Sequence, residues 1–381
     1  MISKPLRPLA MAVRAPLAII IVAILSGCFG GVAKIQPTEL QPVTALVGAR
    51  QSWTTRIGPV NFPLDVNVSG PSVAVAGSDG IVAVLDAQTG RDIWRVALDT
   101  PISAGVGSDG KVVAVVTKAN EVVALQDGRE LWRQKLGAQV FTAPFVAGAR
   151  VFVLAADRSV NAFDGQTGRK LWAQQRPSEP LVLRQSGVLL AVGDTLVVGL
   201  AGRLVGLNPA NGSIRWEAPI ASPRGINDVE RLVDLVGRVS RQADTVCVRA
   251  FQASIGCVDA ARGSLLWTKP AHGAQGIHGD DRLLFGTEAD GTVMAWRRSD
   301  GERAWSTDHL RYRSLTAPMV IGRSVAMGDF AGFIHLLSRE DGSLLNRLPT
   351  DGSAIAAAPV LAGRTLVAVT HNGGVYGFQP E

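Results

Sequence analysis

Short apolar runs separated by glycine and polar residues recur along the chain from about residue 50 to its C-terminus. After Trp132, four such runs cover residues 142–148, 150–157, 159–164 and 170–175. The runs either alternate apolar and polar residues or are continuously apolar, and they lack the 3.6-residue spacing of an amphipathic helix. The pattern therefore predicts an all-β chain made of four-stranded units.

A tryptophan marks the end of each unit. In six segments a short apolar approach leads into a polar turn that ends in glycine, and a tryptophan follows four residues after that glycine. The six are Trp94, Trp132, Trp172, Trp216, Trp267 and Trp305, and Asn346 occupies the same slot in a seventh segment. Successive slots are 38 to 51 residues apart. A period of about 40 residues built from four strands is typical of a β-propeller blade.

The first and last units are incomplete and complement each other. Residues 51–58 (QSWTTRIG) place Trp53 one period before Trp94, without a preceding glycine turn. The C-terminal unit has three strands and no tryptophan strand. We therefore expect the N-terminal strand to complete the last blade, which removes an open sheet edge. With seven complete units between them, the prediction is an eight-bladed β-propeller of four-stranded antiparallel blades over residues 50–381.

The tryptophans are expected on the outermost strand of each blade. There an indole ring can wedge between its own blade and the next one. Burying about 150–250 Å² of indole surface contributes roughly 4–6 kcal/mol as an upper bound. We therefore interpret Trp53 and the six tryptophans above as residues that lock blade to blade, rather than as a surface for stacking a cofactor.

Two linkers are longer than the others. Residues 175–187 follow the strand of Trp172, and residues 219–238 follow the strand of Trp216. Linkers of the same type in adjacent blades emerge on the same face of a propeller, so we expect these two to form one surface patch. The patch residues are Leu181, Leu183, Arg184, Glu230, Arg231, Leu232 and Asp234. Mixed apolar and charged residues are typical of protein interfaces, which favours a partner-binding surface over two solvated loops.

Residues 1–27 have the features of a secretory signal peptide. Three basic residues, Lys4, Arg7 and Arg14, accompany nine apolar residues at 17–25. A transmembrane helix needs about 20 apolar residues, so this run is too short to span a bilayer. We expect the segment to be removed and the protein to lie outside the cytoplasm. Its removal lowers the formal charge from +6 to +3, spread along the chain, so no nucleic-acid-binding surface is indicated.

The end of the leader carries a lipidation signal. Leu25-Ser26-Gly27-Cys28 resembles a bacterial lipobox. The resemblance implies that Cys28 becomes the first residue of the mature protein and carries acyl chains such as palmitate, with residues 28–49 as a flexible tether. Phe29, in place of aspartate after the cysteine, implies sorting to the outer membrane. The alternative is a plain signal peptide with an incidental cysteine.

The sequence carries no catalytic or metal-binding motif. The five histidines are scattered, and no HExxH, GxSxG, Walker or dinucleotide-binding pattern is present. We therefore assign no catalytic residue, metal or cofactor.

Two further cysteines flank a predicted hairpin. Cys247 and Cys257 lie on either side of a tip near Gln252, which places them opposite each other on neighbouring strands. An oxidising compartment permits a disulfide between them, and two buried thiols are the alternative.

The repeat FDGQTGRKLW (residues 163–172) resembles the motif of pyrroloquinoline-quinone (PQQ) propeller proteins, and the resemblance covers the chain after Gln51. Two functions share this motif. Quinoprotein dehydrogenases bind PQQ and Ca²⁺ on the propeller axis, whereas the BamB family comprises propeller lipoproteins of the β-barrel assembly machinery. The lipobox, the eight blades without an added domain and the paired long linkers favour the BamB family. This resemblance implies a non-enzymatic scaffold that aids the folding and insertion of outer-membrane β-barrel proteins.

Two stretches are similar to the interaction segments of that family. They are residues 180–184 (PLVLR) and 226–235 (INDVERLVDL). The resemblance implies that the seven patch residues bind the periplasmic POTRA domains of the barrel-inserting subunit. Family members often carry a second acidic residue two positions after Asp234, where this chain has Val236. The family is also expected to present unfolded barrel proteins, by strand addition to exposed sheet edges.

A PQQ-dependent dehydrogenase is the main alternative. The quinoprotein resemblance implies a longer chain and a vicinal cysteine pair, whereas Cys247 and Cys257 are ten residues apart. No set of calcium ligands emerges from the spacing of carboxylates and amides. A generic ligand-binding propeller is a third possibility, but it leaves the lipobox and the paired linkers unexplained.

Overall fold

The computed structural model describes residue 1 and residues 35–175, 181–223 and 225–381. The predicted signal peptide and Cys28 lie outside these residues. Residues Pro37–Glu381 form one compact unit, in which the described residues contain strands and no helix. Accordingly, the described part of the chain offers no helix with the length and apolarity needed to cross a bilayer.

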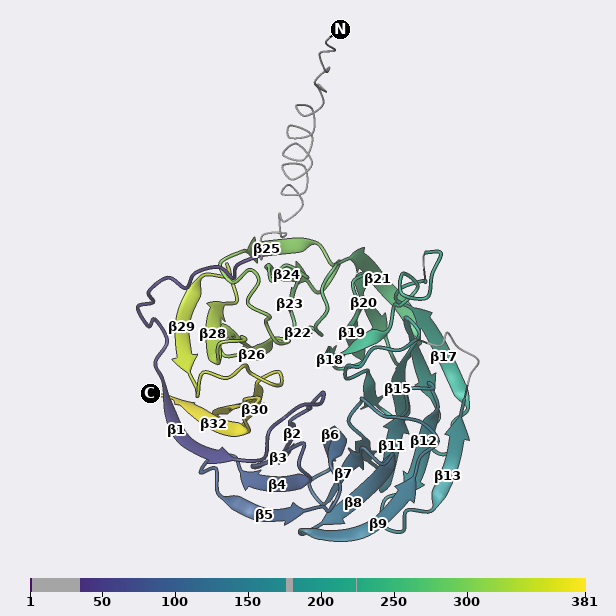
Figure 1. The fold of residues 1–381 in the computed structure, drawn as a ribbon. Helices are drawn as coiled ribbons and strands as arrows, with labels where there is room; N and C mark the ends of the chain where they lie inside the picture. The colour runs from purple at the N-terminus through teal and green to yellow at the C-terminus, as the bar shows by residue number, and fades with distance from the viewer. Residues whose placement is uncertain (2–34, 176–180, 224) are drawn as a thin grey trace. The chain divides into compact units, whose positions relative to one another are not determined.

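Eight four-stranded antiparallel sheets, the blades, follow one another in a ring over the described residues from 49 to 380 (Figure 1). Blade 1 contains β2 (Asn67–Ser69), β3 (Ser72–Ala76), β4 (Ile81–Asp86) and β5 (Asp92–Ala97). Blade 2 contains β6 (Ile102–Ser108), β7 (Val112–Thr117), β8 (Glu121–Gln126) and β9 (Arg129–Lys135). Blade 3 contains β10 (Phe145–Ala147), β11 (Arg150–Leu154), β12 (Val160–Asp164) and β13 (Lys170–Gln174). Blade 4 contains β14 (Leu189–Val192), β15 (Thr195–Leu200), β16 (Arg203–Leu207) and β17 (Ile214–Pro219).

The remaining blades repeat this order. Blade 5 contains β18 (Leu235–Gln242), β19 (Thr245–Ala250), β20 (Ser254–Asp259) and β21 (Ser264–Pro270). Blade 6 contains β22 (His278–Gly279), β23 (Leu283–Thr287), β24 (Val293–Arg297) and β25 (Arg303–Thr307). Blade 7 contains β26 (Met319–Ile321), β27 (Ser324–Gly328), β28 (Phe333–Ser338) and β29 (Leu344–Pro349). Blade 8 contains β30 (Val360–Ala362), β31 (Thr365–Val369), β32 (Gly374–Pro380) and β1 (Ala49–Arg56).

Blade 8 is assembled from both ends of the chain. Strand β1 pairs antiparallel with β32, and the register places Trp53 opposite Gly377 and Thr54 opposite Tyr376. Figure 1 shows this seam as the purple β1 lying along the yellow β32. The predicted eight-bladed propeller, closed by an N-terminal strand that completes the last blade, is confirmed.

The two middle strands of each blade carry most of the core. In β7 all six residues are buried, whereas the outer strand β5 alternates between exposed and partly buried positions. One apolar cluster contains Val73 of blade 1, Val115 of blade 2 and Val367 of blade 8. Separate apolar clusters of this kind join neighbouring blades around the ring.

Each of the seven repeat tryptophans lies in the outer strand of its blade and reaches the glycine turn of the next blade. Among the described residues, five indole N–H groups donate to main-chain carbonyl oxygens of those turns. These bonds run from Trp53 to Ala87 (3.1 Å), Trp132 to Gly165 (2.9 Å), Trp172 to Pro209 (2.9 Å), Trp267 to Arg298 (2.9 Å) and Trp305 to Arg339 (2.8 Å). Trp94 and Trp216 lie against the turn glycines Gly128 and Gly263.

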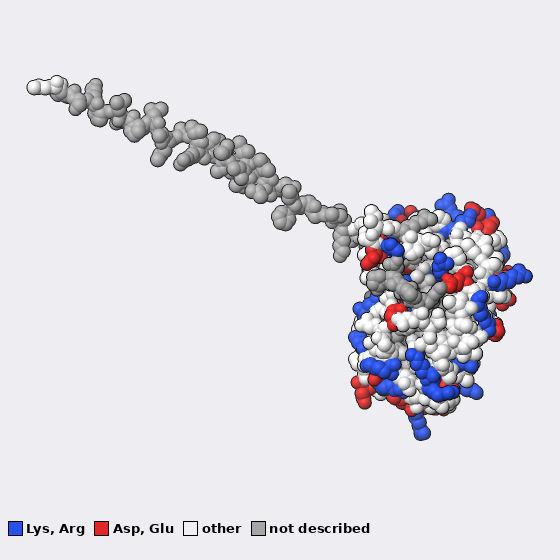
Figure 2. Space-filling model, turned by 90° about the vertical axis from the view of Figure 1, so that its right-hand side faces the viewer, with Lys and Arg blue, Asp and Glu red and all other residues white. Residues whose placement is uncertain are grey.

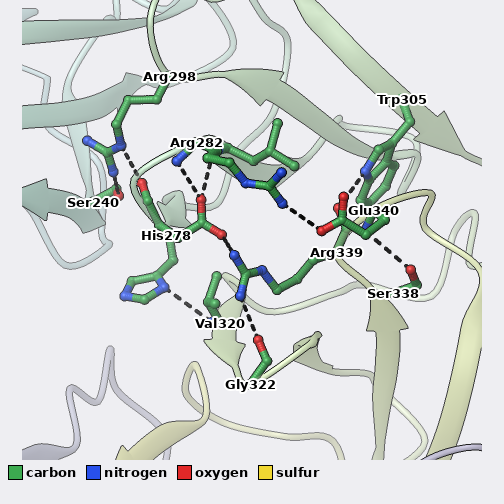
Figure 3. A network of polar contacts seen from close by, with 12 residues as sticks. Ser240, His278, Arg282, Arg298, Trp305, Val320, Gly322, Ser338, Arg339 and Glu340 are labelled. Carbon is green, nitrogen blue, oxygen red and sulfur yellow. Dashed lines mark hydrogen bonds and ion pairs between the residues drawn. The ribbon is translucent and has the colours of Figure 1, made fainter.

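Ion pairs reinforce the joint between blades 6 and 7 (Figure 3). Arg282 of blade 6 pairs with Glu340 of blade 7 at 2.7 Å. Arg339 of blade 7 pairs with Asp280 of blade 6 and also donates to the carbonyl oxygen of Gly322 at 2.6 Å. Both pairs lie beside the Trp305 contact, so apolar packing and charge act on the same joint.

Residues 38–47, which we call the strap, run along blade 7 before β1 begins. The amide of Leu46 donates to the carbonyl oxygen of Leu345 at 2.8 Å, and Arg347 donates to the carbonyl oxygen of Gln41 at 3.1 Å. Leu40 packs against the apolar core beneath. The strap belongs to the predicted tether of residues 28–49, of which residues 28–34 lie outside the described residues.

The strap explains why the seventh repeat has asparagine in place of tryptophan. Blade 8 has no turn between its third and fourth strands, because β32 and β1 come from opposite ends of the chain. No turn glycine is therefore present to receive an indole from blade 7. Instead, Asn346 donates from Nδ2 to the carbonyl oxygen of Val47 at 2.8 Å and so binds the strap.

Candidate docking surface

The candidate site consists of two linkers that precede inner strands. The first linker, residues 175–188, connects β13 to β14, and the second, residues 220–234, connects β17 to β18. Residues 176–180 and 224 lie outside the described residues. The linkers contact each other directly, because the amide of Leu183 donates to Oδ2 of Asp234 at 3.0 Å. Two segments separated by a whole blade in sequence thus form one continuous surface.

The first linker presents both exposed and partly buried predicted residues. Leu181 is 39% exposed and Arg184 is also exposed, so both side chains can contact a partner. Leu183 is partly buried and lines a small cavity of about 50 Å³ between the linker and the blades. In the first linker, Leu181 and Arg184 therefore face outward, whereas Leu183 faces the blades.

The second linker folds into a compact turn. Asn227 accepts the amide of Glu230 on its side chain at 2.9 Å, and Glu230 in turn accepts the amide of Ile226 at 2.9 Å. Glu230 and Arg231 are exposed, whereas Leu232 is partly buried. These local hydrogen bonds are typical of Asx-stabilised turns, which hold a surface loop in one conformation.

Two exposed apolar residues of this turn are absent from the sequence-based set. Ile226 is 99% exposed and Val229 is 71% exposed. Exposed apolar side chains beside a mixed patch are typical of interfaces. Both residues lie in the stretch INDVERLVDL, which the sequence marks as part of the patch. The sequence alone does not show which apolar residues of a loop face solvent.

Arg158 joins the two linkers to blade 3. It lies in the turn between β11 and β12, and its Nη2 donates to Oδ1 of Asp234 at 3.0 Å and to the carbonyl oxygen of Leu181 at 2.9 Å. The side chains of Arg158 and Asp234 are only 8% and 17% exposed. Arg158 is absent from the sequence-based set. A signal was present, because the equivalent turn position holds Gly80, Asn120 or Gly332 in other blades, whereas here an arginine adopts a positive φ of 61°.

The ends of both linkers continue to the propeller axis. Ser186 of the first linker donates to the carboxylate of Asp65, and Arg238, just after the second linker, donates to the carbonyl oxygen of Pro359 at 2.7 Å. Burial lowers the pKa of Arg238 to about 10, although the nearby Asp65 opposes the shift. Burial also raises the pKa of Asp65, partly offset by the bond from Ser186. Asp65, Ser186 and Arg238 line an axial cavity of about 320 Å³.

A wider groove lies beside the second linker. It has a volume of about 710 Å³, and its walls include Val229 and Leu232 of the linker and Phe251 and Lys269 of blade 5. The docking surface, defined as the exposed residues of the two linkers, therefore borders an open depression. On the side of the propeller that carries β13 and β17, basic and acidic side chains are interspersed with neutral ones (Figure 2).

The two remaining cysteines form a disulfide in the structure. Cys247 of β19 and Cys257 of β20 are directly paired across the hairpin whose turn contains Gln252, and both are fully buried. Among the described residues, no group of three or more histidine, cysteine, aspartate or glutamate side chains is arranged to hold a metal ion.

Comparisons with known proteins place this molecule among the PQQ-like-repeat propellers with eight blades. The family model described as "Outer membrane protein assembly factor BamB" matches residues 78–307. A protein of that name from Burkholderia pseudomallei is 38% identical over 353 residues, which cover 92% of this chain and 93% of the relative. The Bordetella pertussis protein of the same name is 35% identical over 90% of each chain. This chain belongs to the BamB family.

The solved structures agree with the fold. The crystal structure of BamB from Moraxella catarrhalis has a TM-score of 0.79 at 22% identity and covers 87% of this chain and 99% of its own. The quinohemoprotein alcohol dehydrogenase from Comamonas testosteroni has a TM-score of 0.67 at 15% identity, covering 88% of this chain and 77% of the dehydrogenase. At these identities both are similar in fold alone. The curated relatives above are named as assembly factors and not as enzymes.

Proposed function

We propose that this protein is a non-enzymatic scaffold of the β-barrel assembly machinery, on the periplasmic side of the outer membrane. It would aid the folding and insertion of outer-membrane β-barrel proteins. The support is membership of the BamB family over nearly the whole chain, together with the name "outer membrane protein assembly factor" that the relatives carry. The fold supplies a rigid closed ring with one elaborated surface.

The partner in this proposal is the POTRA region of the barrel-inserting subunit, bound at the docking surface. The observation that carries it is the hydrogen bond between the Leu183 amide and Asp234, which joins two linkers from different blades into one surface. The exposed Leu181, Arg184 and Glu230 give that surface the apolar and charged mixture of transient protein interfaces.

Pull-down from detergent-solubilised envelopes tests this assignment. The variant Leu181→Asp plus Arg184→Glu changes two exposed side chains, so it should stay folded and lose capture of the barrel-inserting subunit. A matched control is Leu131→Asp plus Arg129→Glu on β9, where Leu131 is 36% exposed against 39% for Leu181. The control should capture the subunit like the wild type. Equal capture by both variants would discard the docking surface.

The membrane attachment is a separate part of the proposal. Lipidation of Cys28, which lies outside the described residues, would hold the propeller at the outer membrane through acyl chains. Cys28→Ala should then move the protein to the soluble periplasmic fraction without changing its melting temperature. Persistent membrane retention of the variant would contradict the lipobox interpretation.

Unfolded barrel proteins are the proposed clients. The outer strands of the blades each have one unpaired edge in the sheet order, to which an extended client strand can add. A photo-crosslinker placed at Leu266 of β21, which is 52% exposed, should capture unfolded outer-membrane proteins in cells. If the amount of crosslinked product stays the same when synthesis of outer-membrane proteins is blocked, the captured molecules are not unfolded clients, and this role is contradicted.

The quinoprotein alternative is not favoured, because the likeness to the dehydrogenases extends only to the fold. Addition of PQQ and Ca²⁺ to the purified protein tests it directly. Dehydrogenase activity, or a new visible absorption band from bound quinone, would reverse the choice.

A further inference from the structure

The carboxylate of Asp234 is engaged on both sides by its own chain. Oδ1 accepts from Arg158 at 3.0 Å, and Oδ2 accepts from the amide of Leu183 at 3.0 Å. Its side chain is only 17% exposed. Each carboxylate oxygen therefore already accepts one bond from within the chain, and the low exposure of the side chain leaves little room for a donor from a partner.

Arg158, the partner of Asp234 in this ion pair, is even less accessible to solvent. Its side chain is 8% exposed, and its Nη2 holds Asp234 and the carbonyl oxygen of Leu181 at the same time. The residue itself is fixed by a tight turn, in which its amide donates to the carbonyl oxygen of Ala155 at 2.9 Å. One guanidinium on a rigid blade thus fixes both linkers.

Apolar packing alone does not hold the first linker in place. A cavity of about 50 Å³ lies beneath it, lined by Leu183, Gln185, Arg158 and Asp234. The atoms around such a cavity lose packing contacts that a filled core would provide. The polar ties of residues 181–183 are the bond from Arg158 of blade 3 to the Leu181 carbonyl oxygen and the bond from the Leu183 amide to Asp234 of the second linker.

We propose that Arg158 is a positioning residue of the docking surface, and that Asp234 acts within the chain rather than by contacting the partner. This proposal rests on the proposed function, because it explains how the surface of Leu181 and Arg184 is held ready for binding. It differs from the sequence-based interpretation, in which Asp234 is itself a contact residue and Arg158 has no role. Preorganisation of this kind lowers the entropic cost of binding.

A double-mutant cycle separates positioning from contact. Full-length wild type, Arg158→Met, Asp234→Asn and the double variant are titrated against the purified barrel-inserting subunit in detergent. If both residues act through one ion pair, each single variant weakens binding by roughly tenfold, and the double variant is no weaker than the worse single variant. Single effects that multiply in the double variant would overturn the proposal, because they would show that Arg158 and Asp234 act independently and not through their shared ion pair.

Hydrogen–deuterium exchange supplies a readout that does not depend on the partner. The peptide that contains Leu183 should exchange faster in Arg158→Met and in Asp234→Asn, and at the wild-type rate in Arg184→Glu. Arg158→Lys keeps one charged donor and should fall between wild type and Arg158→Met in both exchange and affinity. Native exchange at Leu183 in Asp234→Asn, with binding lost, would show that Asp234 contacts the partner.

Arg313→Met is the matched control. Arg313 pairs with Asp329 in blade 7 and its side chain is 7% exposed, close to the 8% of Arg158. This variant should be less stable than wild type but bind the subunit with affinity within about twofold of it. If wild type itself fails to bind the subunit, the proposed function fails, while the exchange measurement still decides whether Arg158 and Asp234 position the linker.

Discussion

The indole nitrogen of Trp132 in blade 2 donates a 2.9 Å hydrogen bond to the carbonyl oxygen of Gly165 in blade 3. The same ring lies against Gly168, where an added Cβ would come within 2.6 Å of the indole. A single side chain thus fills the joint between two blades and satisfies a main-chain acceptor there. The ring is only 7% exposed.

Removal of this side chain should weaken the propeller strongly. Trp132→Ala deletes the packing and the hydrogen bond together, and we expect a loss of about 3–5 kcal/mol in the free energy of unfolding. Chemical denaturation followed by circular dichroism measures it. The neighbour Leu131, 36% exposed, is the control, and Leu131→Ala should cost less than about 1 kcal/mol. Similar losses in both variants would show that the joint does not depend on the indole.

The turn glycines should be required for packing as well as for backbone conformation. Gly168 has φ of 70° and Gly363 has φ of 60°, so alanine strains the backbone at both. Only at Gly168 would the new Cβ press on the tryptophan, whereas nothing lies within 4 Å of the Cβ position at Gly363. Gly168→Ala should therefore cost about 1–3 kcal/mol more than Gly363→Ala in thermal or chemical unfolding. Equal losses in the free energy of unfolding would show that Gly168 is required only for its positive φ and not for packing against the tryptophan.

The strap should depend on Asn346. Asn346→Ala removes the donor to the Val47 carbonyl oxygen, and we expect a loss of about 1 kcal/mol together with faster proteolysis within residues 38–47. Asn346→Trp restores the repeat residue but offers it no turn glycine, so it should displace the strap and not stabilise the protein. A tryptophan variant more stable than wild type would refute this explanation of the seventh repeat.

The repeat made the fold predictable. Six tryptophans follow a turn glycine by four residues, and each indole packs against the turn glycine of the next blade, as Trp132 does on Gly168. This contact recurs around the ring and so left a regular pattern in the sequence. The strand of Trp53 could be placed in the last blade because it lacked a turn of its own. The exception at Asn346 was visible in the sequence, but its cause was not, since the strap that binds it lies about 300 residues earlier in the chain.

The docking surface was predictable only in part. The length of the two linkers indicated where it lies, and the contact of Leu183 with Asp234 joins them. Arg158 was not predicted, because its bond to Asp234 spans 76 residues and the sequence alone does not show which turn lies beneath the linkers. The sequence also does not show which side chains of a loop are exposed to solvent. Ile226 is almost fully exposed and Leu232 is not, although both are aliphatic residues of the same segment.

A partly buried histidine should make the stability of the propeller depend on pH. His278 of β22 accepts the amide of Val320 in blade 7 on Nδ1 at 3.2 Å (Figure 3), and this bond requires an unprotonated nitrogen. Burial, together with the nearby positive charges of Arg238 and Arg298, lowers the pKa of His278 to about 3. Burial also lowers the pKa of His335, which acts in the same direction.

The sign of the effect follows from proton binding. In the unfolded chain a histidine takes up its proton at about pH 6.5, whereas folded His278 does so only near pH 3. Between these values the unfolded state binds more protons, so the free energy of unfolding falls as the pH is lowered. From pH 7 to pH 5 the share of His278 is on the order of 1–2 kcal/mol. Urea unfolding of wild type and His278→Gln at both pH values measures this share, because the variant cannot take up that proton and should lose less stability on acidification. Identical losses in the two proteins would mean that His278 takes up its proton at the same pH in the folded and unfolded states.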